Sequence, residues 1–275
     1  MPLSISTNVA SLSAQRSFMN SNAALETAFE RLSTGKRVNS SVDDAAGLAI
    51  GKNLEARVSG LNQAIRNTND GISMVQIAEG AMDEATSILQ RMRDLAVQAA
   101  NDSMGTAERT FLETESDKLI TALENAFDQA TFNGIDLIDT NAAVSLTFQV
   151  GADNGDTLAV SIDSLSGAAL TVEDADLDFD SAANASAAIG KIDTALSTIY
   201  SDRATLGAIQ AQMESTVRNL ANVAENTAAA TGRIMDTDYA AETANLTKAQ
   251  ILQQAATSIL AQANAQPQSV LALLQ

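Results

Sequence analysis

The sequence contains no cysteine and no histidine, and each of these two absences removes a class of function. Without cysteine there are no disulfide bonds, thiol nucleophiles or thiolate metal sites. Without histidine there is no imidazole base and no histidine-ligated zinc. No nucleophile, base or metal cluster stands out among the remaining residues. We therefore expect a protein that is not an enzyme and that uses no cofactor or metal.

Positive charge and long apolar runs are also scarce. The chain has only 16 Lys and Arg but 34 Asp and Glu, so its formal net charge is −18. Phosphate binding needs clustered Lys and Arg, which argues against a nucleic-acid partner and against an anionic membrane surface. No run of about 18 apolar residues is present, so no membrane insertion is expected. The N-terminus has no basic region followed by a solid apolar segment, so no cleaved secretory signal is expected.

Proline occurs only at positions 2 and 267, and the apolar content is rich in alanine, which favours long helices that pack closely. Two runs show heptad spacing. The first run is Val75, Ala78, Met82, Ala85, Leu89, Met92, Ala96 and Ala99. The second run is Ile189, Ile192, Leu196, Ile199, Leu206, Met213, Val217 and Leu220, with Arg203 and Gln210 at the remaining seam positions. The pattern predicts long helices packed side by side.

The stretch between the two runs has a different character. Residues 145–162, "SLTFQVGADNGDTLAVSI", place β-branched and aromatic residues on both sides of a turn, which predicts a β-hairpin. Four alternating aspartates follow: Asp174, Asp176, Asp178 and Asp180. Their spacing resembles a calcium loop, but Phe179 stands where an EF-hand needs glycine and Ala185 where it needs glutamate. The acidic stretch is better explained as a solvated face.

Two short motifs predict local structure. In "NSSVDDAAGLAI", Ser41 with Asp44 three residues later forms a capping-box pattern before an apolar helix, and Asp43 lies near the positive helix end. An acid–base pair of Asp43 and Asp44 is the alternative, but no complementary group lies nearby in the sequence. In "FNG", residues 132–134, Gly134 permits a positive φ and predicts an anchored turn.

Both ends of the chain are nearly uncharged. Residues 1–24 carry only Arg16, and residues 246–275 carry only Lys248. Each end has apolar residues at helical spacing, which predicts one apolar face per helix: Leu25, Phe29 and Leu32, and Ile251, Leu252, Ala255, Ile259, Leu260 and Ala263. The simplest interpretation is two helices that cover each other in a monomer.

The polar faces of these helices, however, are Ser, Thr, Asn and Gln, which suits helices surrounded by protein on several sides. We therefore expect the C-terminal tail, with Val270, Leu271 and Leu274, to be buried in an assembly beside the N-terminal helix and its symmetry mates.

Five stretches carry a family resemblance that covers nearly the whole chain: ALETAFERLSTGKRVNSSVDDAAGLAIG, LNQAIRNTNDGISMVQIAEGAMDE, LQRMRDLAVQAAND, TFNGIDLI and GRIMDTDYAAETANLTKAQILQQAATSILAQANAQPQSVLALLQ. With these stretches the chain resembles bacterial flagellin, in a minimal form whose variable outer region is reduced to about residues 140–185. The resemblance implies a mainly α fold, a coiled-coil-like helical rod from both chain halves with a small β-hairpin region.

The resemblance also implies an arrangement of five segments. Residues 1–40 and 240–275 would pair as helices lining the inner tube of a filament, with packing residues Ile251, Leu252, Ile259, Leu260, Val270, Leu271 and Leu274. Residues 41–139 and 186–239 would form the two halves of the rod domain. Residues 140–185 would hold the β-hairpin and a short acidic outer insert. Contacts that do not close into a ring give an open helical polymer, the bacterial swimming propeller.

The partners implied by the resemblance are the chain itself, an export chaperone at the C-terminal tail, and the hook-junction and filament-cap proteins. The family is exported unfolded by a type III apparatus without signal cleavage, which implies an extracellular filament.

Toll-like receptor 5 is a further candidate partner. The resemblance places its contact surface at Arg91, Leu95 and Glu115. The heptad seam predicts that Arg91 and Leu95 lie partly outside it, on a face open to an axial neighbour, so we expect the patch mainly to join subunits and receptor binding to be secondary.

Two other classes of function remain open from the sequence. A secreted coiled-coil translocator or pore-former would share the alanine-rich helices, but it should show a longer apolar hairpin than this chain has. An enzyme would need a nucleophile, a base or a metal cluster.

Overall fold

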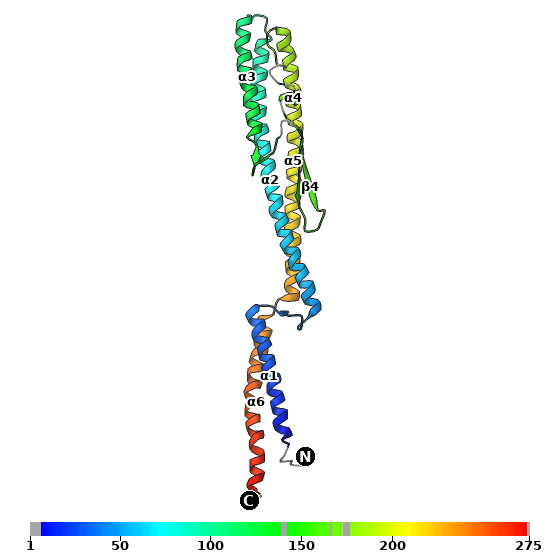
Figure 1. Ribbon diagram of the computed structural model, residues 1–275, viewed down its shortest axis with the longest axis vertical. Coiled ribbons are helices and arrows are strands. Elements are labelled where there is room, and N and C mark those ends of the chain that lie inside the picture. The colour runs from blue at the N-terminus through cyan, green and yellow to red at the C-terminus, as the bar shows by residue number, and fades with distance from the viewer. Residues whose placement is uncertain (1–6, 139–141, 166, 171, 173–176, 274–275) are drawn as a thin grey trace. The chain divides into compact units, whose positions relative to one another are not determined.

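The computed structural model describes the backbone of residues 7–138, 142–165, 167–170, 172 and 177–273, and the side chains of all of these except 168, 169 and 266–273. Within them the chain is mainly helical, which confirms the predicted fold class (Figure 1). The elements in chain order are α1 (Val9–Thr34), α2 (Ala45–Ala99), α3 (Thr106–Asp128), β1 (Thr131–Phe132), β2 (Ile135–Asp136), β3 (Val144–Gln149), β4 (Thr157–Ile162), α4 (Gly167–Leu170), α5 (Ala182–Met235) and α6 (Tyr239–Leu273).

The chain divides into two compact units. Residues 59–224 form the first, which we call the rod unit, and residues 1–58 with 225–275 form the second, which we call the terminal unit. The charge is unevenly divided between them. The rod unit holds eight Lys and Arg against 25 Asp and Glu, a net charge of −17, whereas the terminal unit holds eight against nine, a net charge of −1.

The core of the rod unit is built where α2, α3 and α5 lie side by side (Figure 1). All eight residues of the first predicted heptad run are buried in it. From the second run, Ile192, Leu196, Ile199, Leu206 and Met213 are buried in the same core. The first run lies within α2 and the second within α5, so the heptad reading of both runs is confirmed.

The prediction that Leu95 lies partly outside the seam is wrong. Its side chain is only 2% exposed and belongs to the core of the rod unit. The reason is that α2 has two helical neighbours here, since Arg91 pairs with Glu115 of α3 and Arg93 with Asp193 of α5. A helix covered from two sides buries a wider stripe than the two-helix seam that the heptad pattern describes.

Both predicted turns form. Strands β3 and β4 pair as an antiparallel hairpin with Val144 opposite Ile162 and Gln149 opposite Thr157, which confirms the hairpin reading. In the shorter hairpin β1–β2, Asn133 and Gly134 both have positive φ, 52° and 78°. Positive φ at both central residues is the geometry that Asn-Gly supplies in tight hairpins.

In the terminal unit, α1 and α6 pack as an antiparallel pair (Figure 1). Asn8 contacts Ala263, Asn22 contacts Gln253, and Arg31 contacts Glu242, so the register is continuous along the pair. The least exposed residues follow heptad spacing: Ser11, Ala14, Phe18, Ser21, Leu25, Ala28 and Leu32 in α1, and Glu242, Leu246, Ala249, Gln253, Ala256, Leu260 and Ala263 in α6. Alanine or serine stands at seven of these fourteen positions, and such small side chains let the helices approach closely.

The prediction that the apolar residues of the last helix share one face is wrong. Leu260 and Ala263 face the seam with α1, whereas Ile251, Leu252 and Ile259 are exposed. These three residues stand 60%, 47% and 55% exposed. Apolar residues occur around much of α6, so periodicity alone could not tell which of them the partner helix would cover.

The cap of α2 also differs from the predicted capping box. Asp44 itself is the capping residue, because its Oδ1 accepts a hydrogen bond of 2.8 Å from the backbone N–H of Gly47. Asp43 instead closes the preceding loop by accepting hydrogen bonds from the backbone of Asn39 and from both the backbone and the hydroxyl of Ser40. These hydrogen bonds, those from Ser40 foremost, lower the pKa of Asp43.

Candidate functional site

The outward surface of the α1–α6 pair is unusually apolar for a helix pair at the surface of its unit. On α6 it presents Ile251, Leu252 and Ile259, and on α1 it presents Leu12 and Met19, which are 55% and 66% exposed. Scattered single apolar residues need no explanation, but exposed large apolar residues that recur along a helix mark that helix for interaction, and both helices of the pair carry such residues. Three of the seven residues predicted to pack in a filament core therefore lie on this surface, and Leu260 lies in the α1–α6 seam.

The described side chains do not include those of the other three predicted packing residues. The side chains of Val270 and Leu271 lie outside the described residues, although α6 continues as a helix to Leu273. Leu274 lies outside them altogether.

A groove of about 470 Å³ runs along one flank of the same helix pair. Asn20, Ala24 and Arg31 line it from α1, and Lys248 and Leu252 line it from α6. Arg31 forms ion pairs with two carboxylates. Its Nη1 lies 4.0 Å from Glu242 Oε2, and its Nη2 lies 3.8 Å from Asp43 Oδ1. The groove thus offers an apolar wall and a positive charge at Lys248, for which the described residues supply no ion pair.

A compact joint connects the two links of the terminal unit, one from α1 to α2 and one from α5 to α6. The N–H of Arg37 donates to the carbonyl of Met235 at 2.6 Å, and the N–H of Thr237 donates to the carbonyl of Gly35 at 3.0 Å. Gly35 has φ of +70°, and a Cβ there would stand 2.8 Å from the Tyr239 hydroxyl. A larger residue at position 35 would therefore be strained and would disturb Tyr239.

Two lysines flank one carboxylate beside this joint. Lys36 Nζ lies 2.7 Å from Glu55 Oε1, and Lys52 Nζ lies 2.8 Å from Glu55 Oε2. Their hydrogen bonds, that of Lys36 first, lower the pKa of Glu55 to about 2. Lys36 and Glu55 come from separate parts of the chain, so sequence reasoning missed this cluster.

The candidate receptor patch on the rod unit is only partly exposed. Arg91 Nη2 lies 2.6 Å from Glu115 Oε1, and both side chains are about half exposed. Leu95 is buried and cannot be part of the surface. One turn before Glu115 on α3, Phe111 is 75% exposed, so it can supply the apolar contact that was expected from Leu95.

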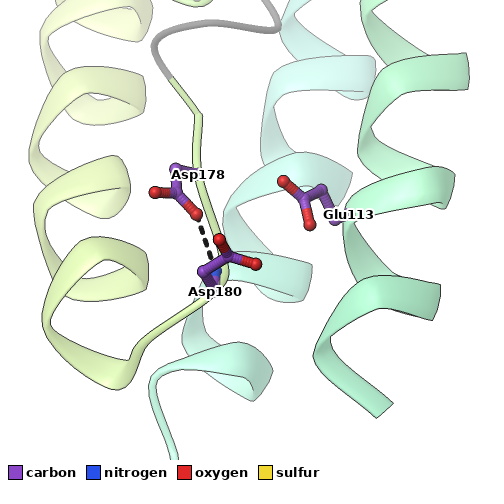
Figure 2. A group of neighbouring side chains, drawn as sticks. All are labelled: Glu113, Asp178 and Asp180. Atoms are coloured by element: carbon purple, nitrogen blue, oxygen red, sulfur yellow. Dashed lines mark hydrogen bonds between the residues drawn. The ribbon is translucent and has the colours of Figure 1, made fainter. Parts of the chain in front are cut away.

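Three carboxylates that no sequence prediction linked come together beside α3. One oxygen from each of Glu113, Asp178 and Asp180 lies within 4.8 Å of the others, and Glu113 points toward the segment that carries the two aspartates (Figure 2). Asp178 already accepts hydrogen bonds of 2.7 Å from the backbone N–H of Asp180 and from the amide of Asn184. These bonds explain its position as a support for the start of α5. Asp174 and Asp176 lie outside the described residues.

One carboxylate of the rod unit is poorly satisfied. Oδ2 of Asp202 is buried without a hydrogen-bond partner among the described residues. Burial, and second the negative charge of Asp163, raise the pKa of Asp202.

Comparison with known families accounts for both the helical architecture and the apolar terminal helices. Residues 5–143 match the bacterial flagellin N-terminal helical region, and residues 189–274 match the bacterial flagellin C-terminal helical region. The chain belongs to the bacterial flagellin family. The flagellin matches contain α1, α2 and α3 on one side, and most of α5 and all of α6 on the other.

Two relatives align with this chain over nearly its full length. The flagellin of Halalkalibacterium halodurans is 41% identical over 272 residues, which are 98% of this chain and 99% of the relative. The flagellar filament 33 kDa core protein of Treponema phagedenis is 37% identical over 284 aligned positions, with 98% and 99% coverage. The crystal structure of Bacillus cereus flagellin aligns with a TM-score of 0.48 and 27% identity, over 60% of this chain and 94% of that one.

Family membership settles the class of function. The chain is a structural subunit of the flagellar filament, it polymerises with copies of itself, it serves motility, and it is not an enzyme. Among the helices in the described part of the chain, none is both long enough and apolar enough to cross a membrane.

Proposed function

We propose that residues 1–40 and 240–275 line the inner tube of the filament, and that the outward apolar residues of α1 and α6 are contacts between copies. The observation that carries this proposal is the exposed set Leu12, Met19, Ile251, Leu252 and Ile259 on a unit whose net charge is only −1. Copies of such a unit can pack together with little electrostatic repulsion and with a gain from apolar burial.

In this proposal, residues 41–139 and 186–239 form the rod that stacks on neighbouring subunits, and residues 140–185 face outward into the medium. The acidic character of the rod unit suits a surface in contact with water. Export through a type III apparatus without signal cleavage, a chaperone that covers the C-terminal tail, and hook-junction and filament-cap proteins at the filament ends complete the set of proposed partners.

The tail offers a direct test. Replacing Leu271 and Leu274 with Asp should put two unpaired charges into an apolar contact and cost several kcal/mol per subunit. We expect the purified double variant to fail to elongate filament seeds, as seen by electron microscopy, while its rod unit still folds. Use of purified protein avoids a secretion defect caused by loss of the chaperone contact.

A matched control adds the same two charges elsewhere. Thr194→Asp with Thr198→Asp changes two exposed positions of α5, and this variant should elongate. Normal filaments from the Leu271 and Leu274 variant would refute burial of the tail.

We further propose that the surface formed by Arg91, Glu115 and Phe111 joins subunits along the filament and is recognised by Toll-like receptor 5 on released monomers as a second role. An exposed arginine held by an ion pair beside an exposed aromatic ring is the type of surface that forms binding hot spots. Leu95 would support the patch from beneath, because it is part of the core.

Arg91→Ala should weaken both the binding of monomers to the receptor ectodomain and the thermal stability of filaments. Arg93→Ala is the matched control, because Arg93 makes a comparable exposed ion pair with Asp193 on the α5 side of the same helix. Equal effects of the two substitutions would argue against a specific surface at Arg91.

A further inference from the structure

The terminal helices hold few charges, and most of these charges have no ion-pair partner among the described residues. Six charged residues lie on α1 and α6: Arg16, Glu26, Glu30, Arg31, Glu242 and Lys248. Only Arg31 and Glu242 meet each other, at 4.0 Å. For Glu30 and Lys248 the described residues supply no ion pair, and Glu26 accepts only a hydrogen bond from the amide of Asn22. Charges that become buried in a polymer must find partners, because an unpaired buried charge is costly.

The first relevant surface is the α6 side of the groove. Lys248 and Leu252, four residues apart, line the groove. Ile259 follows seven residues after Leu252 and lies on the same flank of α6. All three side chains are exposed. Along the helix this flank therefore reads as one positive charge followed by two large apolar residues.

The second surface is the outer face of α1. Leu12, Met19, Glu26 and Glu30 follow one another at intervals of seven, seven and four residues, so at about 100° per residue they share one face. All four are exposed, and the seam residues Ala14 and Ala28 point elsewhere. This face reads as two large apolar residues followed by two negative charges.

The antiparallel register puts the two surfaces level with each other. Three contacts show which residues of α1 and α6 lie at the same height along the pair: Asn8 with Ala263, Asn22 with Gln253, and Arg31 with Glu242. By these contacts Leu12 lies level with about residue 261, Met19 with about residue 254 and Glu26 with about residue 247, at a rise of about 1.5 Å per residue. Leu12 is thus level with Ile259, Met19 with Leu252, and Glu26 with Lys248, each within about two residues.

We propose that the outer face of α1 in one copy packs against the groove flank of α6 in a second copy that lies alongside it in the same direction. In this contact Lys248 pairs with Glu26 and Glu30 of the neighbour, Leu252 meets its Met19, and Ile259 meets its Leu12. The inference deepens the proposed role of the terminal helices in the inner tube and rests on that role.

Two features select a second copy as the occupant of the groove. The charges are complementary in sign, and the apolar and charged residues occur in the same order and at the same level on both surfaces. Because the two surfaces are different, the contact leaves a free groove on one copy and a free outer face on the other. Such a contact repeats without end, as an open polymer requires.

Charge reversal on purified chains tests this contact in seeded elongation. Lys248→Glu alone, and Glu26→Lys with Glu30→Lys, should each raise the critical concentration for elongation of wild-type seeds by at least about tenfold, because like charges then face each other. An equimolar mixture of the two variants should elongate better than either variant alone, since the carboxylate introduced at position 248 of one chain then meets the lysines introduced in the other. Arg66→Glu, at an exposed position of α2 in the rod unit, controls for the change in net charge.

Elongation of both variants at the wild-type critical concentration would overturn the contact. Failure of the mixture to elongate better than the separate variants, with rod-unit helix content intact by circular dichroism, would overturn it as well. An Arg66→Glu defect as large as that of Lys248→Glu would show that net charge alone is responsible. Failure of the wild-type chain itself to elongate would instead overturn the proposed function, and the contact with it.

Discussion

Single residues in this chain often serve two elements at once, and Asn8 is the clearest example. Its Oδ1 caps α1 by accepting from the N–H of Ser11 at 3.0 Å, and its Nδ2 donates to the carbonyl of Ala263 in α6 at 2.7 Å. Position 267, four residues after Ala263, is proline and has no N–H to offer this carbonyl. Asn8 therefore supplies the donor that the helix itself lacks.

This arrangement predicts an energetic coupling between Asn8 and Pro267. Asn8→Ala should lower the thermal depolymerisation midpoint of filaments, because it removes a cap worth about 1 kcal/mol and leaves the Ala263 carbonyl without a donor. In a Pro267→Ala background the restored N–H can reach that carbonyl, so the loss should be smaller.

Asn8→Ser separates the two roles, because serine keeps a capping oxygen but loses the amide donor. A loss from Asn8→Ala that is the same with and without Pro267 would contradict the coupling.

The low pKa of Glu55 predicts that the stability of the folded chain depends on pH. Its pKa is about 2 in the folded chain, below the value of about 4.3 in unfolded chains, so its ion pairs contribute fully above pH of about 4.3. The contribution is lost as pH falls toward about 2. Glu55→Gln should therefore reduce stability at pH 7 by less than about 1 kcal/mol, since the groups are partly exposed, and should change nothing near pH 2.

Thermal unfolding of wild type and Glu55→Gln at pH 7, 4 and 2 measures this difference. If the difference in stability between the two proteins stays constant over this pH range, the charge of the Glu55 carboxylate plays no part.

At the scale of elements, the long helices are shaped by how many neighbours they have. Helix α2 buries a wide stripe near its end because α3 and α5 both pack on it, whereas α1 and α6 meet along a single narrow seam of small residues. The difference explains why Leu95 is in a core while Ile251 and Ile259 are exposed. A helix with one partner keeps apolar residues available for further contacts.

Leu95→Ala tests the three-helix packing of the rod unit. It should reduce the free energy of unfolding of the monomeric rod unit by about 2–5 kcal/mol, because it leaves a cavity in a closed core. Val97→Ala, two residues away on the same helix and about half exposed, should cost well under half as much. Chemical denaturation followed by circular dichroism would measure both, and equal losses would show that the α3 side of α2 is not closed.

At the scale of the whole molecule, charge and apolar surface are separated along the chain. The rod unit has a net charge of −17 and a large apolar core, whereas the terminal unit has a net charge of −1 and buries mostly alanine, serine and polar side chains between α1 and α6. A seam of small residues removes little apolar surface from water and gives weak stabilisation. Assembly must then supply what the α1–α6 pair lacks.

We therefore expect both terminal segments to be largely disordered in free subunits and to become helical on assembly. Hydrogen exchange on monomers and on filaments measures this directly, with the buried stretch of α2 from residue 75 to 99 as the internal reference. Residues 250–265 should exchange fast in monomers and slowly in filaments. Strong protection of these residues before polymerisation would contradict the expectation.

The sequence by itself determined the features that depend on neighbours in the chain. The heptad runs gave α2 and α5, alternating residues gave the β3–β4 hairpin, and Asn133 with Gly134 gave the tight turn, because local periodicity and backbone preference act over a few residues. The resemblance in the terminal blocks led to the flagellin family, which the comparisons confirm.

Only the tertiary structure decided which apolar faces are covered and which charges meet. It buried Leu95, divided Leu260 from Ile251, made Asp44 the cap of α2, and brought Glu113 to Asp178 across many residues. The physical reason is that a periodic pattern states that a face is apolar but not how many partners will cover it. Long-range pairs such as Asn8 with Ala263 depend on the register of two distant helices, which no local rule encodes.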